Sequence, residues 1–77
     1  MTAQAGTTRD LDLCGLEPPE PMLRILTTLE ALPGGTSLRA RTDRQPIHLF
    51  PELIARGASY TSEAAGDGSW ITTITPT

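Results

Sequence analysis

The stretch LCGLEPPEP, residues 13–21, places the only cysteine of the chain beside two glutamates and three prolines. Cys14 could act as a thiol nucleophile or a redox group, and together with His48 and a carboxylate it could bind Zn²⁺ or iron. Asp12 lies two residues before Cys14, and a nearby negative charge raises a thiol pKa because it disfavours the thiolate. We therefore interpret Cys14 as a small, half-buried apolar residue, with a displaced sulfur-carrying or redox thiol as the alternative.

The elements around this stretch follow from the hydrophobic pattern. Residues 9–14, RDLDLC, alternate apolar and acidic side chains, which predicts a short strand that ends at Gly15. Over residues 19–32 the period changes, and one face becomes apolar through Met22, Ile25, Leu26, Leu29 and Leu32. This spacing predicts an amphipathic helix, which the PGG at 33–35 ends.

The second half of the chain predicts three strands and one more helix. Residues 36–42 form a strand with Leu38 and Ala40 facing inward, and residues 58–65 and 69–76 form a hairpin through GDG at 66–68. Between them we expect a helix with Asp43 as its N-cap and Pro46 in its first turn. Because of Pro51, the element is either a turn followed by a helix or a helix kinked at Pro51. Its buried side is made of Phe50, Leu53 and Ile54.

The order strand, helix, strand, helix, strand, strand predicts an α/β (α+β) two-layer sandwich. The first two strands are parallel because a helix connects them, and the last two are antiparallel. Both helices then cover one face of a mixed four-stranded sheet. We expect residues 1–8 to be a disordered tail and 9–77 to be one domain. Trp70 and Ile74 alternate with Ile71, which suggests that a partner chain covers part of the open face, although Trp70 could equally pack at an edge.

Functional sites in open α/β sheets gather where strands end and helices begin. That edge should carry Cys14, Glu17, Pro18, Pro19 and Glu20 from the first junction and Asp43, Arg44 and His48 from the second. The prolines remove N–H donors from the helix start and the glutamates occupy it with negative charge, which argues against a phosphate site there.

Arg39 and Arg41 lie on the outward face of the second predicted strand and, with Arg44, form the main basic cluster. They could bind an anionic partner. The alternative is a solvated face on which Glu63, across the sheet, balances their charge.

The segments LDLCGLEPPEP, LPGGTSLRARTD and PIHLFPEL together resemble the TusA/SirA-like superfamily. More closely, they resemble a branch of unknown function that often accompanies hemerythrin-like domains. The resemblance covers roughly residues 10–75 and implies the βαβαββ fold. Sulfur carriers of the superfamily have a Gly-Leu-x-Cys-Pro-x-Pro motif. Here Gly15, Leu16, Glu17, Pro19 and Pro21 match, but Pro18 stands at the nucleophile position, so sulfur transfer by that residue is not implied.

The composition of the chain argues against several classes of function. The net charge of −3 argues against nonspecific nucleic-acid binding, and no apolar run is long enough to span a bilayer. The N-terminus lacks the features of a signal peptide, so we expect a cytoplasmic protein. The single cysteine rules out an internal disulfide. Hydrophobic residues make up 38%, which predicts a small core that dimerisation would help to stabilise.

Three functions remain open. The first, which we favour, is a non-catalytic interaction or regulatory module that works through a protein partner, with a homodimer as one option and no cofactor. The second is a sulfur carrier or sulfurtransferase that uses Cys14. The third is a small-ligand or metal site at the edge shared by Cys14 and His48, connected with oxygen or nitrosative sensing.

Overall fold

The computed structural model describes residues 7–76. Its elements are β1 (Thr8–Asp12), α1 (Glu20–Ala31), β2 (Ser37–Thr42), α2 (Leu49–Ala55), β3 (Ser59–Ala64) and β4 (Trp70–Thr75). The predicted βαβαββ order is confirmed. Of the predicted N-terminal tail, residues 1–6 lie outside the described residues, whereas Thr8 already belongs to β1.

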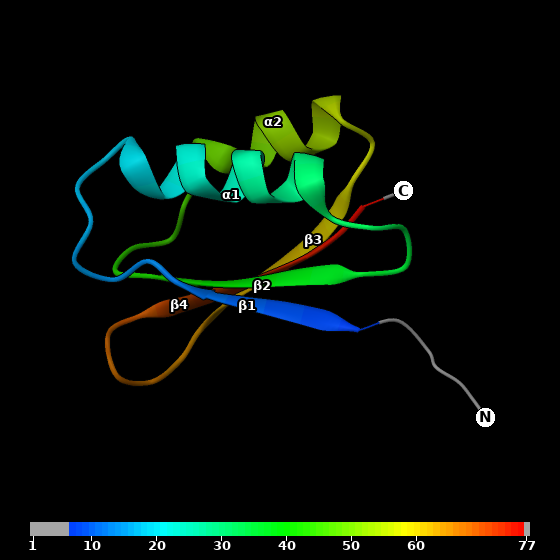
Figure 1. Ribbon diagram of the computed structural model, residues 1–77. Coiled ribbons are helices and arrows are strands. Elements are labelled where there is room, and N and C mark those ends of the chain that lie inside the picture. The colour runs from blue at the N-terminus through cyan, green and yellow to red at the C-terminus, as the bar shows by residue number, and fades with distance from the viewer. Residues whose placement is uncertain (1–6, 77) are drawn as a thin grey trace.

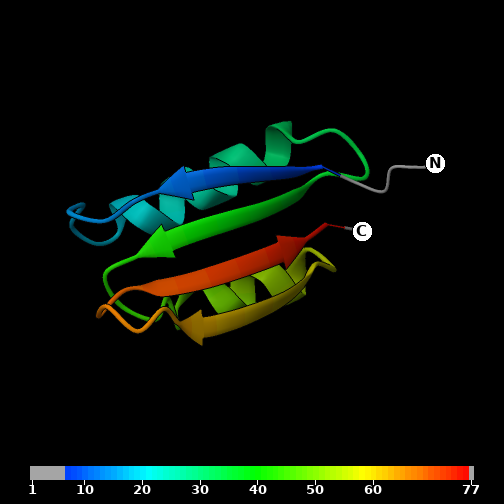
Figure 2. The same cartoon turned by 90° about the horizontal axis from the view of Figure 1, so that it is seen from below.

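The four strands form one mixed sheet in the order β1-β2-β4-β3. β1 and β2 are parallel, and β4 pairs antiparallel with both β2 and β3. Figure 1 shows both helices on one face of this sheet, and Figure 2 shows the opposite face without any covering element among residues 7–76. The molecule is therefore the predicted two-layer sandwich, with β1 and β3 as its edge strands.

The core lies between the helices and the sheet. Leu38 and Ala40 of β2 are fully buried and face inward as predicted. Buried side chains from other elements complete the cluster: Leu13, Ile25, Leu29, Leu49, Leu53 and Ile74. The apolar stripe of α1 packs against this cluster, because Met22, Leu26 and Leu32 are partly buried beside it.

The prediction that Asp43 caps the second helix is wrong. The N-cap of α2 is His48, and residues 46–49 first form a turn in which the Leu49 N–H donates to Pro46 O at 3.0 Å. Because α2 starts this late, Pro51 falls in its first turn, where the backbone N–H has no helical partner to lose. Pro51 therefore does not kink the helix, and of the two arrangements expected from it the structure has the turn followed by a helix.

The expected buried side of α2 is partly wrong. Leu53 is buried, but Ile54 is 66% exposed, and Leu49 takes the second buried position. Residues four apart share one helix face, so Leu49 and Leu53 point together into the core. Phe50 packs on β3, where its ring stacks on that of Tyr60 with centroids 4.5 Å apart.

The open face of the sheet is mainly polar. Ile74 is fully buried on the helix side of β4, and Trp70, four residues earlier on the same strand, lies on the same side. Trp70, Ile71 and Ile74 had suggested that a partner covers the open face. Of these three residues, only Ile71 lies on that face. Thr73, Thr61, Arg39 and charged residues of β1 share this face with Ile71.

Candidate functional site

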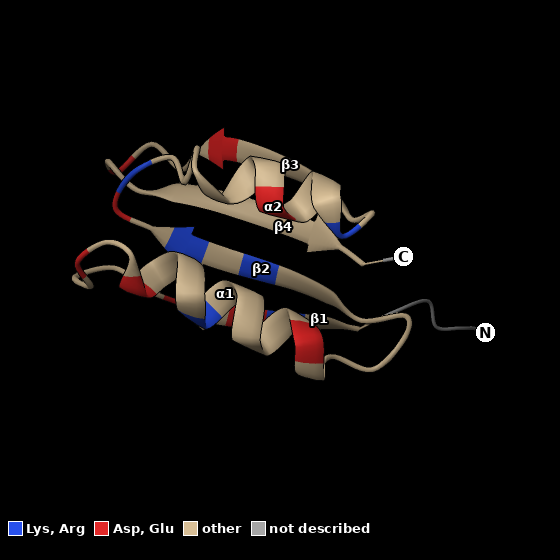
Figure 3. Ribbon diagram, turned by 90° about the horizontal axis from the view of Figure 1, so that it is seen from above, with Lys and Arg blue, Asp and Glu red and all other residues tan. Residues whose placement is uncertain are grey.

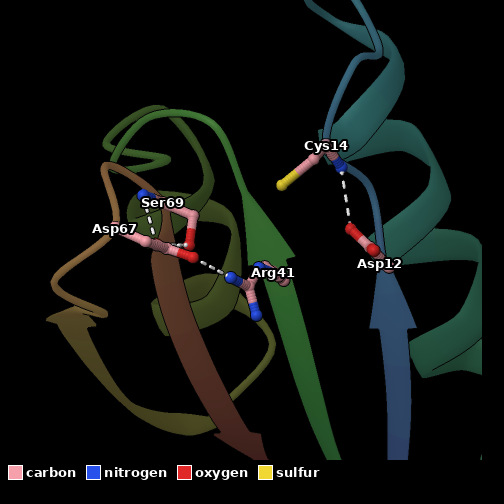
Figure 4. A network of polar contacts seen from close by, with 5 residues as sticks. All are labelled: Asp12, Cys14, Arg41, Asp67 and Ser69. Carbon is pink, nitrogen blue, oxygen red and sulfur yellow. Dashed lines mark hydrogen bonds and ion pairs between the residues drawn. The ribbon is translucent and has the colours of Figure 1, made fainter.

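The candidate site lies at the end of the sheet where β1 and β2 terminate. We call this end the carboxyl-end edge, to distinguish it from the edge strands β1 and β3. The β3–β4 hairpin turn lies at the same edge, because β4 begins where β2 ends, with Thr42 opposite Trp70. Figure 4 shows Cys14 on one side of this edge and the contact between Arg41 and Asp67 on the other. Three loops far apart in sequence are therefore brought together, two of which the sequence predicted.

Asp43 links the first two loops. Its Oδ2 accepts a hydrogen bond of 2.7 Å from the backbone N–H of Gly15. Gly15 has a φ of 87°, a left-handed conformation that glycine adopts without the strain of a Cβ. The Asp12 carboxylate accepts a bond of 3.2 Å from the Cys14 backbone N–H. Two aspartates therefore fix the turn that presents the cysteine.

Cys14 is exposed, in contrast to the half-buried position that we expected. Partial loss of water contact, a hydrogen bond with Asp12 and the charge of Asp43 all raise the pKa of its thiol above the ordinary value of 9.0. This is the direction that Asp12 predicted. A raised pKa keeps the sulfur protonated near neutral pH, and the thiol is the less nucleophilic form.

The proline-rich turn before α1 is exposed. Glu17, Pro18 and Pro19 all lie at the surface, and Glu20 is half-buried. The N–H of Glu20 donates to Glu17 O at 2.9 Å, and the N–H of Leu23 donates to Pro19 O at 3.1 Å. The Glu20 carboxylate pairs with Arg24 at 2.8 Å. Most backbone N–H groups at the start of α1 are thus missing, because the residue is proline, or already donate to a carbonyl within the turn. This agrees with the argument against an anion site.

The junction between β2 and α2 places exposed side chains at the site but does not supply a set of metal ligands. Arg44 is exposed, and its carbonyl accepts a 2.6 Å bond from the Thr42 hydroxyl. His48 is also exposed and makes no side-chain bond to the helix that it begins. Within residues 7–76, no group of three or more histidine, cysteine or carboxylate side chains is arranged to hold a metal ion. The metal site left open as an alternative at Cys14 and His48 thus has no complete ligand set among the described residues.

The arginines of β2 lie on the open face of the sheet, because Arg39 is paired with Thr73 and Arg41 with Ile71. Figure 3 marks the basic positions of β2 in blue. Arg39 pairs with Asp10 of β1 at 2.8 Å, and Arg41 pairs with Asp67 of the hairpin turn. The prediction that Glu63 balances them is wrong. The neighbours of β2 are β1 and β4, so Asp10 lies next to Arg39, whereas Glu63 is one strand further away.

Asp67 is the site residue that the sequence analysis missed. Its Oδ1 accepts hydrogen bonds from the Ser69 hydroxyl and from the Ser69 N–H, the latter at 3.0 Å. These bonds, with a smaller contribution from the Arg41 charge, lower the pKa of Asp67 below its ordinary value of 3.8. The signal was present in GDGS, because an aspartate two residues before a serine commonly accepts its backbone N–H.

The matched family covers almost the whole described chain. The family model described as "Uncharacterized conserved protein (DUF2249)" matches residues 10–76. The chain belongs to the DUF2249 family. A comparison with curated proteins found no significant match. Membership of this family gives the domain no known activity, because the family is itself described as uncharacterised.

The match leaves only the ends of the chain outside the DUF2249 region, so that region contains every residue of the candidate site. Over the part of the chain that the structure describes, no helix of this DUF2249 domain is long and apolar enough to cross a membrane.

Replacing Asp67 with asparagine should lower the stability of the DUF2249 domain in a pH-dependent way. The folded state lowers the pKa of this carboxyl, so it contributes stability above the ordinary pKa of 3.8 and loses that contribution as the pH falls through the lower folded value. The difference in urea midpoint between Asp67→Asn and the native protein should thus be largest at neutral pH and shrink in acid. Glu17→Gln, at an exposed carboxylate with no ion pair among the described residues, is the control. A pH-independent difference would contradict the assignment.

Proposed function

We propose that this protein is a non-catalytic interaction module with a TusA-like fold, and that the carboxyl-end edge of its sheet binds a protein partner in the cytoplasm. The observation that carries the proposal is the construction of this edge. Asp43 fixes the first loop through Gly15, and Asp67 fixes the hairpin turn through Ser69 and Arg41. A surface with ordered loops loses little conformational entropy when a partner binds.

The chemistry of the edge supports binding over catalysis. In the sulfur carriers that the motif resembles, a cysteine occupies the position of Pro18. Here that position has no thiol, and the neighbouring Cys14 has a raised pKa. A catalytic thiol needs the opposite shift, produced by a positive charge or by free N–H donors. The proposal includes neither a cofactor nor nucleic acid.

One observation favours a second candidate, a sulfur carrier that uses Cys14. The thiol is exposed rather than half-buried, so a donor could reach it. A hemerythrin-like domain, which often accompanies the branch that the sequence resembles, would fit either candidate, because an interaction module and a carrier both work through a second protein.

The pH dependence of thiol alkylation, followed by intact mass, separates the two candidates. For the interaction module, we expect no gain of one sulfur on incubation with a persulfide donor and an alkylation midpoint above 9.0. Asp43→Asn keeps an oxygen for the Gly15 N–H and removes the charge, so it should move the midpoint downward. Stoichiometric sulfur gain that Cys14→Ser abolishes would overturn the non-catalytic assignment.

The binding surface has its own test. Cross-linking in cells of the source, read by mass spectrometry, should recover a partner through residues of the 13–19 loop. Glu17→Arg should reduce this cross-linking, because Glu17 is exposed on that loop. Glu30→Arg makes the same charge change at another exposed carboxylate, at the other end of α1, and is the control. Equal yields from both variants would contradict a partner at this edge.

A further inference from the structure

We infer that β3 pairs with β3 of a second copy of this chain, so that two sheets join into one. The inference deepens the proposed function by naming one partner, and it rests on that function in treating the domain as an interaction module. The dimer contact uses a different surface from the proposed binding edge. It is formed by the outer edge of β3, not by the loops that follow β1 and β2.

The outer edge of β3 has free hydrogen-bonding groups. β3 is the last strand of the sheet, and Figure 2 shows no element beyond it among residues 7–76. Ala65 N donates to Ser69 O, which marks a hydrogen-bonded pair, and such pairs recur at every second residue of an antiparallel ladder. Glu63 and Thr61 therefore bond inward to β4. The N–H and C=O groups of Tyr60, Ser62 and Ala64 point outward.

β3 is complementary to itself. In an antiparallel pair centred on Ser62, the outward groups of Tyr60 meet those of Ala64 in the second copy, so every outward N–H and C=O finds a partner. Thr61 then lies opposite Glu63 on the open face, and no like charges meet. The strand also lacks proline and lysine, the residues that commonly protect an edge from pairing.

The other edge of the sheet is not complementary to itself. β1 has the sequence TRDLD, with Arg9, Asp10 and Asp12. An antiparallel pair with its own copy places Arg9 opposite Arg9, Asp10 opposite Asp10, or Asp10 opposite Asp12, depending on the register. Like charges directly opposite each other destabilise a strand pair. Repulsion between like charges therefore disfavours pairing through β1, and a second copy pairs through β3.

An exposed apolar residue lies beside the same edge. Phe50 stacks on Tyr60 of β3, and Ile54, four residues later, shares that flank of α2. The opposite flank faces α1, because Arg56 contacts Glu30 there at 3.8 Å. Ile54 is 66% exposed on the flank beside β3. A two-fold axis perpendicular to the sheet keeps both α2 helices on one face and brings Ile54 toward the second copy, which would cover it.

Sedimentation equilibrium of the full chain over a concentration series tests the pairing. We expect a reversible dimer. Thr61→Glu places a carboxylate opposite Glu63 of the second copy at two symmetric positions and should raise the dissociation constant about tenfold. Thr61→Glu combined with Glu63→Arg restores an attractive pair and should recover the native value. Thr8→Glu makes the same change on β1 and should have no effect.

A pair of helix variants provides an independent measure. Ile54→Asp should weaken the dimer several-fold, whereas Leu23→Asp, at a 49% exposed position of α1, should not. Both positions are exposed, so both variants should keep the fold, which circular dichroism checks. A chain that stays monomeric, or a dimer that the Thr61 and Ile54 variants leave intact, overturns the pairing. The persulfide and alkylation results do not depend on this outcome, so the two proposals fail separately.

Discussion

Replacing Leu38 with alanine should lower the free energy of unfolding by about 2–5 kcal/mol. Leu38 is fully buried at the centre of the core, on the strand that lies between β1 and β4. Removing its side chain loses transfer free energy and leaves a cavity that the sheet backbone cannot close. Folded domains have about 5–15 kcal/mol in total, and a small domain lies toward the lower end. A large share of the stability therefore depends on this one side chain.

Urea denaturation followed by circular dichroism measures this loss, and the chain offers a matched control. Leu23→Ala removes the same atoms from a position that is 49% exposed, and surface changes of this kind are commonly within about 0.5 kcal/mol of neutral. A Leu38→Ala midpoint as high as that of Leu23→Ala would show that the core is not where the structure has it.

The fold could be predicted because local signals agreed with one another. The stripe of α1 identified its buried face, and the glycines after the helices and in the hairpin marked the ends of the elements. α2 was predicted less well. Asp43 satisfies every local rule for an N-cap, but its carboxylate bonds to Gly15, which is 28 residues away in the sequence. No local rule can weigh a contact of that separation.

The candidate site shows the same limit. The positions of Cys14 and Asp43 at one edge followed from the parallel arrangement of β1 and β2. The hairpin turn with Asp67 joined them only because β4 lies next to β2, and no local pattern in the sequence specifies that strand order. The order also decides which carboxylates pair with Arg39 and Arg41, and so explains why Asp10 and Asp67, rather than Glu63, take this role.

Replacing Gly15 with alanine should lower the free energy of unfolding by about 1–2 kcal/mol, because a residue with a Cβ is strained in the left-handed region. Gly15 has a φ of 87°, and an added Cβ there would meet no atom within 4 Å, so the cost arises from the backbone and not from a clash. Gly34→Ala is the control. A Cβ at Gly34 also meets nothing within 4 Å, and its φ lies outside the left-handed region, so alanine there should be neutral or slightly stabilising.

The Gly15 variant should also release the loop from Asp43. Alanine relieves its strain by leaving the left-handed conformation, and this movement breaks the bond from the Gly15 N–H to the Asp43 carboxylate. Asp43→Ala breaks the same bond from the other side, so the double variant should be less destabilised than the sum of the two single variants. Strict additivity would mean that the two residues act independently. Coupling would show that the turn presenting Cys14 and Pro18 is held by a side chain of the second junction, which is the preorganisation that a binding edge requires.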